Sequence, residues 1–339
     1  MNDHCKNLEK DSAQQSLIEL DQNKDFQVTH FTPIEEFFEN YTSIHTRRNY
    51  KNDLLKFFDY VTEEYPDIKE KGDIERDVVI KYRNFLAETG GQHGGPCAPK
   101  TIARKLATLS CYFDFLVEKG IMEFNPAKSI KRPRREVLKP TQALSPEQVR
   151  SLFLLLKDGD QKSTSRYLHR ALLITFFMTG MRKSEVLYLK YKDYRQINDY
   201  TVLEFIGKGG KVGQKVLHPL CIEALEDYFS WMRGMDRAHG PEDWLFQPSR
   251  NPLDPENINK PLNPKTINEI IQNYGKKIGL NFPIGPHSAR ATFIGQLLEA
   301  GVDIYSVARE VNHSSVKTTQ EYDKRRKKLS DSPISKLKY

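Results

Sequence analysis

The sequence predicts a mainly α protein of two domains, the second of which contains a small β-sheet. Apolar residues recur at helical spacing along most of the chain, and a single stretch, residues 201–220, has two halves that suit a β-hairpin. The length of 339 residues also allows two domains, each with its own hydrophobic core.

The first domain is predicted to be all-helical. A helix is expected to start within residues 31–41, with Thr32 as N-cap, Pro33 in the first turn and glutamates at the positive end of the helix dipole. Residues 77–88 form a further short helix, and the glycine- and proline-rich residues 90–100 form a loop. Two longer helices are indicated by apolar residues at positions 50, 54, 57, 58 and 61, and at positions 102, 106, 109, 113 and 116.

The second domain is predicted to open with a capping box, in which Ser145 is the N-cap, Pro146 the first helical residue and Gln148 the third. An apolar helix then ends at Gly180, and Gly209 and Gly210 lie at or near the turn of the β-hairpin. The remaining segments are again helical, at residues 264–279, 287–301 and 303–312.

Between the domains, residues 125–142 contain three prolines, which interrupt any helix, and six basic residues against one acidic residue. Such a charge bias suits a segment that lies on a phosphate backbone, and a solvated tether is the alternative. We therefore predict a flexible polar tail at 1–27, a helical domain at 28–130, a basic linker at 131–142, a second domain at 143–328 and a C-terminal tail at 329–339.

The overall charge and the cysteines indicate the general class of the protein. A formal charge of +7 and a pI of about 9.0 suit a polyanionic partner, although many proteins with this balance bind none. The four cysteines form no CxxC pair, so neither a disulfide framework nor a zinc ribbon is expected. Because no signal peptide and no run of about 18 apolar residues is present, we expect a soluble, cytoplasmic protein without membrane contact.

Six polar residues of the second domain stand where helices or strands end. Arg182 follows the glycine that closes a helix, and Lys208 lies at the tip of the hairpin. His287 and Arg290 are three positions apart and would share one face of a helix. Each alone is compatible with helix capping, solvent exposure or packing. The six are Arg182, Lys208, His287, Arg290, His313 and Tyr322.

Together, in this order and at these separations, the six residues resemble the catalytic set of the tyrosine recombinase (phage integrase) family. The resemblance extends from the helical segment TSIHTRRNYKNDLLKFFDYV to Tyr322. Its most specific elements are TGMRKSEVLYLK, the hairpin VLEFIGKGGKVGQKVLHPL, the HxxR pair and HSSVKTTQEY. It implies a helical core-binding (SAM-like) domain followed by a mostly helical catalytic domain, which together clamp DNA.

The resemblance also implies a chemical role for each residue. Tyr322 attacks phosphorus and carries a 3′-phosphotyrosyl bond, while the planar guanidiniums of Arg182 and Arg290 neutralise the non-bridging oxygens. Lys208 protonates the leaving 5′ oxygen, although the sequence leaves Lys211 open for this role. Since the energy of the diester is preserved in the tyrosyl bond, no ATP, metal or other cofactor is expected.

The two histidines are expected to assist this reaction. His287 either accepts the tyrosine proton or hydrogen-bonds the phosphate, and His313 donates to a non-bridging oxygen. Glu185 fits an acid that orients the active-site groups, with an exposed helix charge as the alternative. Two positions depart from the family pattern: Ala291 stands where histidine is frequent, and Asn312 where glycine is usual. Asparagine tolerates the left-handed conformation that closes a helix.

Two sets of basic residues are candidates for DNA contact. The resemblance places two helices of the first domain in or near the major groove, and ordinary surface charge is the alternative. Their candidates are Arg47, Arg48, Lys51, Lys100, Arg104 and Lys105. In the linker the candidates for phosphate contact are Lys131, Arg132, Arg134 and Arg135.

The predicted function is that of a site-specific DNA recombinase that acts as a homotetramer on double-stranded recombination sites, for integration or excision of a mobile element. The alternatives are Xer-type chromosome or plasmid dimer resolution, a type IB topoisomerase-like activity, and a catalytically silent DNA-binding regulator. A need for accessory DNA-bending proteins stays open. In this family a C-terminal segment often docks on a neighbouring protomer, and Ile334 and Leu337 would share one face of a short helix there.

Overall fold

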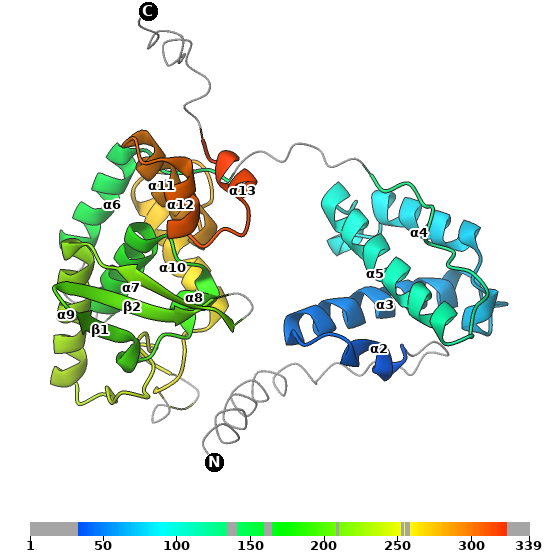
Figure 1. The fold of residues 1–339 in the computed structure, drawn as a ribbon, viewed down its shortest axis with the longest axis horizontal. Helices are drawn as coiled ribbons and strands as arrows, with labels where there is room; N and C mark the ends of the chain where they lie inside the picture. Colours follow the sequence, from blue (N-terminus) through cyan, green and yellow to red (C-terminus); the bar gives the residue numbers. More distant parts are fainter. Residues whose placement is uncertain are drawn as a thin grey trace, which may run out of the picture. The chain divides into compact units, whose positions relative to one another are not determined.

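The computed structural model describes residues 33–133, 141–158, 165–207, 210–251, 254 and 258–323. These residues form two compact units, an N-terminal unit up to residue 133 and a C-terminal unit from residue 141, and each unit has its own hydrophobic core (Figure 1). The predicted fold class, mainly helical with one small sheet, is confirmed. No helix in the described ranges is both long and apolar enough to cross a membrane.

The described N-terminal unit is helical, as predicted. Its first helix begins one residue after Ile34, so Pro33 precedes the helix instead of lying in its first turn, and the predicted cap Thr32 lies outside the described residues. Ser43 caps the long second helix by accepting a hydrogen bond from the Thr46 amide. The α-helices are α2 (Glu35–Glu39), α3 (Ile44–Glu64), α4 (Arg76–Glu88) and α5 (Pro99–Glu118).

Aromatic side chains fill the core of this unit. The apolar positions predicted for α5 are all buried, as are those of α3 except Tyr50, which is half-buried. Phe57 of α3 meets Tyr82 of α4 and Phe113 of α5 edge to face, with ring centroids 5.0 and 5.9 Å apart. One aromatic cluster therefore fixes the relative positions of the three longer helices.

The described C-terminal unit consists of helices around the apolar helix α7, with a three-stranded sheet. Its first helices are α6 (Pro146–Asp158), α7 (Arg166–Thr179) and α8 (Lys183–Leu187). The strands are β1 (Tyr194–Ile197), β2 (Tyr200–Ile206) and β3 (Val212–Val216). The later helices are α9 (Pro219–Gly234), α10 (Pro264–Lys277), α11 (Pro286–Glu299), α12 (Ile304–Glu310) and α13 (Val316–Gln320). The last three follow one another at one end of the unit, coloured orange to red in Figure 1.

The predicted helix boundaries at α6 and α7 are present. The Gln148 amide donates to Ser145 Oγ at 3.3 Å, and the Ser145 amide donates to Gln148 Oε1 at 2.9 Å, which completes the capping box. Gly180 closes α7 with a φ of 60°, a left-handed conformation that favours glycine. An added Cβ there would lie 2.5 Å from the ring of Phe293 on α11. The glycine thus allows the end of α7 to approach α11.

The predicted hairpin is present as β2 and β3, which pair antiparallel with Val202 opposite Val216 and Ile206 opposite Val212. The Gly207 amide donates to the Lys211 carbonyl at 2.7 Å at the closed end of the hairpin. Strand β1, which the sequence did not indicate, pairs with the other edge of β2.

Candidate active site

Arg290 connects three helices of the C-terminal unit. It lies on α11, is 4% exposed, and donates through Nη1 to the Gly180 carbonyl at the end of α7 at 2.7 Å. Its Nη2 donates to the Val311 carbonyl, which directly follows α12. Because the Gly180 and Val311 carbonyls belong to the ends of two different helices, this one guanidinium fixes the ends of α7 and α12 against the first half of α11.

Arg182 is held at the start of α8 by Glu185. The Arg182 amide donates to Glu185 Oε2 and its Nη1 donates to Oε1, both at 2.7 Å, and Nη2 donates to the Asn312 carbonyl at 3.0 Å. Glu185 is only 5% exposed, so its alternative interpretation as an exposed helix charge is wrong. The carboxylate instead orients the Arg182 guanidinium.

The turn that follows α12 presents the next predicted residue. Asn312 has a φ of 51°, the left-handed conformation expected for it. Its amide donates to the Arg309 carbonyl at 3.0 Å, and the His313 amide donates to the Ala308 carbonyl at 2.9 Å. This pair of bonds is a Schellman motif, which ends the helix and directs the chain at His313 away from the helix axis. Residues 310–313 are called the α12 turn below.

His313 and Tyr322 lie beside each other across α13. The His313 Nδ1 and the Thr319 Oγ1 are 2.8 Å apart, and Thr319 is fully buried. The rings of His313 and Tyr322 are stacked, with centroids 6.2 Å apart and 20° between their planes. Tyr322 also packs against a small apolar cluster formed by Ile294, Leu298, Val307 and Val311.

Burial and neighbouring charges set the ionisation of the two central groups. Burial, and next the positive charge of Arg182, lower the pKa of Arg290 to about 10, so the guanidinium is still charged at neutral pH. Burial raises the pKa of the Tyr322 phenol, whereas the Arg290 charge acts in the opposite direction. The phenol is therefore protonated at neutral pH, and a base must remove its proton before it can act as a nucleophile.

Both histidines of the set are neutral at pH 7. Desolvation, followed by the charges of Arg290 and Arg182, lowers the pKa of His313 to about 4. His287, on the first turn of α11, reaches the surface, and desolvation and the same arginine charges lower its pKa too. A neutral imidazole can accept a proton at one nitrogen and donate a hydrogen bond from the other.

The structure therefore brings Arg182, Arg290, His313 and Tyr322 together around the α12 turn, with His287 near the two arginines. Lys208 lies outside the described residues, and Lys211 is exposed. Sequence reasoning assigned no role to two residues that contact His313 or the α12 turn. Thr319 carries no sequence signal beyond its place between His313 and Tyr322. Lys215 was considered only as a neighbour of Lys208, and it is buried on β3.

The candidate DNA-binding residues of the N-terminal unit differ in their accessibility. Lys105 is 8% exposed, and its amine and the Arg104 guanidinium both bind the buried carboxylate of Asp53. Lys51 is exposed and donates to Glu35 at 2.8 Å. Residues also exposed are Arg47, Arg48, Lys100, Lys131 and Arg132. Arg134 and Arg135 lie outside the described residues.

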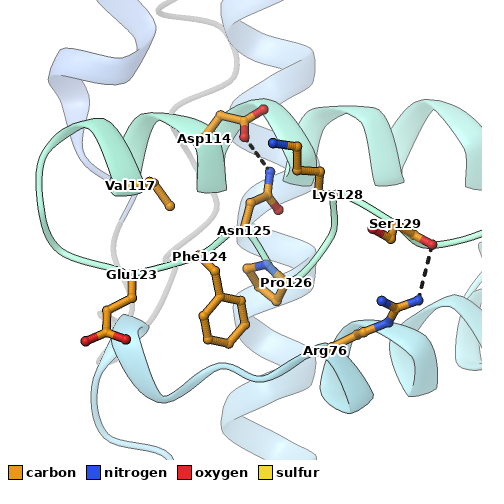
Figure 2. A pocket seen from close by; sticks show the side chains of 9 residues that line it. All are labelled: Arg76, Asp114, Val117, Glu123, Phe124, Asn125, Pro126, Lys128 and Ser129. Atoms are coloured by element: carbon orange, nitrogen blue, oxygen red, sulfur yellow. Dashed lines mark hydrogen bonds between the residues drawn. The ribbon is translucent and has the colours of Figure 1, made fainter.

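A pocket in the N-terminal unit lies where the chain leaves α5. Its lining includes the exposed ring of Phe124, and the Arg76 side chain donates to the Ser129 carbonyl at 3.3 Å (Figure 2). The charges of its lining residues are balanced, since Arg76 and Lys128 are matched in number by Asp114 and Glu123. This balance does not favour an anion, and the lining holds no nucleophile paired with a base. Among the residues that the structure describes, no group of three or more His, Cys, Asp or Glu side chains could hold a metal ion.

A helical domain followed by a helical domain with a three-stranded sheet, together with an arginine, an HxxR pair, a histidine and a tyrosine in this order, defines the class of tyrosine recombinases. Comparison with protein families agrees: the Phage integrase family matches residues 142–328, and the N-terminal SAM-like domain of phage integrases matches residues 34–120. The chain belongs to the phage integrase family.

Two relatives illustrate this membership. The chain is 29% identical over 285 residues to tyrosine recombinase XerC of Thermodesulfovibrio yellowstonii, covering 83% of this chain and 85% of that protein. It is 26% identical over 296 residues to tyrosine recombinase XerD of Halalkalibacterium halodurans, covering 87% and 91%. Both relatives are matched over most of their length.

Solved structures of recombinases share the fold. The XerH site-specific recombinase bound to a palindromic difH substrate, in a post-cleavage complex, matches with a TM-score of 0.68 and 21% identity, covering 87% of this chain and 81% of that one. A lambda integrase dimer bound to a COC′ core site matches with a TM-score of 0.60 and 16% identity, covering 87% and 97%.

Proposed function

We propose that the chain is a site-specific DNA recombinase that cleaves and rejoins double-stranded DNA through a 3′-phosphotyrosyl intermediate on Tyr322. The observation that carries this proposal is that four of the candidate residues, Arg182, Arg290, His313 and Tyr322, gather at the α12 turn. Both guanidiniums bind carbonyls of the turn, His313 is its last residue, and the His313 ring stacks on Tyr322. A nucleophile and two fixed cations thus lie within one small region.

The reaction assigned to this site exchanges one phosphate ester for another. The Tyr322 oxygen attacks phosphorus and loses its proton to His287, the bond from phosphorus to the 5′ oxygen breaks, and Lys208 protonates that oxygen, with Lys211 as the alternative acid. Arg182, Arg290 and His313 stabilise the charge on the non-bridging oxygens. A 5′ hydroxyl of another strand then attacks the tyrosyl ester in the reverse sense, so neither ATP nor a metal is required.

The hydrogen bonding of the arginines supports their role as a clamp. A guanidinium has five N–H donors. Arg290 directs two of its nitrogens to the Gly180 and Val311 carbonyls, and Arg182 directs two to Glu185 and Asn312. Each head is therefore fixed by the protein and still has N–H groups left for a phosphate.

For the DNA contacts, we infer that exposed cations of the N-terminal unit and the linker bind phosphates, and that the enzyme acts as a tetramer on two duplexes. In the N-terminal unit we assign these contacts to Arg47, Arg48, Lys51 and Lys100, which are exposed. Arg104 and Lys105 are held by Asp53, so we assign them first to the joining of α3 and α5.

For the biological task we propose integration or excision of a mobile element. Xer-type dimer resolution is the second candidate, and the XerC and XerD relatives favour it. Covalent capture of genomic DNA ends by the protein, followed by sequencing, separates the two. Ends that map to the borders of a mobile element support the first, and ends at one chromosomal or plasmid site support the second.

The nucleophile is tested by Tyr322→Phe, which removes only the phenolic oxygen. Tyr305→Phe is the matched control, since Tyr305 is 70% exposed on α12. With a nicked cognate duplex in millimolar EDTA, the wild type and the control should give an SDS-resistant protein–DNA band. Tyr322→Phe should bind the duplex but give no band. A band with Tyr322→Phe would refute the assignment, and a wild type that is active only with Mg²⁺ would refute the metal-independent mechanism.

A further inference from the structure

Three cations bind three successive carbonyls at the end of α12. Lys215 Nζ donates to the carbonyl of Glu310, Arg290 to that of Val311, and Arg182 to that of Asn312. The cations come from β3, α11 and the start of α8. Carbonyls at the C-terminus of a helix lack partners within the helix and carry partial negative charge, so they are natural acceptors for cations.

Lys215 is as deeply buried as Arg290, whereas Arg182 is partly exposed. The Lys215 side chain is 2% exposed, and its Nζ also donates to Glu310 Oε1 at 2.8 Å. The ring of Phe293 on α11 lies 5.9 Å from the ammonium. A buried ammonium is costly unless it is hydrogen-bonded, and Glu310 supplies two acceptors through its backbone and its side chain. The hydrogen bonds of the ammonium go to the backbone and the side chain of Glu310, so we assign its action to the α12 turn and not to a phosphate.

We propose that Lys215 is a positioning residue for strand cleavage, which fixes the α12 turn and thereby the placement of His313 and of the two guanidiniums. This inference rests on the proposed function. Without the ammonium, the Glu310 carbonyl loses its donor and the first residue of the turn is no longer tied to β3. Displacements of about 1 Å in a catalytic group lower rates by up to about 100-fold, so a small shift of the turn is sufficient.

The test compares Lys215→Met, which keeps the length of the side chain but not its charge, with Lys215→Arg, which restores a buried cation. The control is Lys192→Met, which removes a surface ion pair with Glu242. The rate constant of covalent adduct formation is measured in a single turnover with a nicked cognate site, together with duplex affinity and thermal unfolding. Lys215→Met should lower the rate constant about 10- to 100-fold at unchanged affinity, Lys215→Arg should recover part of it, and the control should match the wild type.

Hydrogen exchange provides a readout that needs no DNA. In Lys215→Met, the amides of Asn312 and His313, which close the Schellman motif, should exchange faster, while those of α7 and α9 stay as protected as in the wild type. If the wild type formed no adduct, the proposed function would fail, and exchange alone would still decide whether Lys215 fixes the turn.

Three outcomes would overturn the inference. One is a Lys215→Met rate constant equal to that of the wild type. Another is a lower final amount of adduct and lower thermal stability at an unchanged rate constant, because this marks a purely structural residue. The third is uniformly faster exchange throughout the unit. Should Lys215→Met not fold, Lys215→Gln, neutral and polar, takes its place with the same expectations.

Discussion

At the scale of single residues, Thr319 determines how His313 presents its ring. Thr319 Oγ1 lies 2.8 Å from Nδ1 of His313, and the imidazole is neutral at pH 7 because its pKa is lowered to about 4 by desolvation and the two arginines. When the threonine hydroxyl donates to Nδ1, the proton of the ring resides on Nε2. That tautomer has the donor which the proposed role of His313 requires.

We predict that Thr319→Val slows covalent adduct formation by about 10-fold, because His313 would lose the group that orients it and a displacement of about 1 Å can lower a rate by up to about 100-fold. The substitution keeps the shape of the buried side chain but leaves Nδ1 without its partner. Thr319→Ser retains the hydroxyl and should stay close to the wild type. The single-turnover rate on a nicked site is the measurement, and equal rates for Val and Ser would show that the hydroxyl does not orient His313.

At the scale of elements, the α12 turn depends on one left-handed residue. We predict that Asn312→Ala destabilises the protein by about 1 kcal/mol, because a Cβ-bearing residue without a polar side chain is strained at a φ of 51°. Asn312→Gly removes that strain and serves as the control. Chemical unfolding measures the difference between the two variants. An alanine variant as stable as the glycine variant would mean that alanine is not strained in the left-handed conformation at this position.

A second prediction at this scale concerns the contact between α7 and α10. His169 lies edge to face against Tyr274, and burial, followed by the charge of Lys277, lowers its pKa to about 4. The folded state therefore favours the neutral ring, and this stability is present above the unfolded pKa of about 6.5 and is lost as the pH falls toward 4.

Between pH 7 and pH 5 the loss from His169 should be about 1 kcal/mol, after allowance for partial solvent exposure. His169→Gln removes the titrating group, so its free energy of unfolding should fall by that much less over the same interval. Urea unfolding at the two pH values gives both numbers. Parallel pH dependences for the two proteins would exclude His169 as a source of the acid sensitivity.

The elements also show what the sequence could predict and what it could not. The capping box at Ser145 and the closing glycine at Gly180 are local signals, and both are observed. Helix α9 was not singled out, although its buried residues at positions 221, 224, 225, 228, 229 and 232 follow helical spacing. Strand β1 has only four residues, of which the middle two are exposed, so its sequence shows no strand pattern. It is extended because it pairs with β2.

At the scale of the whole molecule, the linker supplies a test of DNA binding. We predict that replacing Arg132, Arg134 and Arg135 with alanine makes the salt dependence of DNA binding weaker. The negative slope of the logarithm of the binding constant against the logarithm of the salt concentration should decrease in magnitude by about 3, since each phosphate contact contributes roughly 0.9. Affinity for cognate and unrelated duplexes should fall to the same extent, because phosphates carry no sequence information. Replacing Lys69, Lys119 and Arg150, surface cations outside the candidate set, is the control. A slope unchanged by the linker substitutions would leave the linker as a solvated tether.

The site as a whole was only partly predictable. Residue types and their order identified the candidate groups, but the acceptors that gather them are backbone carbonyls, which every sequence contains. Lys215 meets Glu310 across 95 positions, and Arg182 meets Asn312 across 130. No local pattern marks such pairs. Likewise, Lys215 belongs to a strand whose other residues are mostly exposed, so its burial follows from the packing of β3 and not from its sequence.

The carbonyl contacts of Arg182 and Arg290 also have an entropic consequence. A free arginine side chain has about 2 kcal/mol of rotamer entropy. Because backbone oxygens of the protein already hold both guanidiniums, much of this freedom is lost when the unit folds, and little would remain to be lost on binding the phosphate of the proposed reaction. In the proposed reaction, more of the attraction between cation and phosphate would then be available to stabilise the pentacoordinate transition state, in which the charge on the oxygens is greatest.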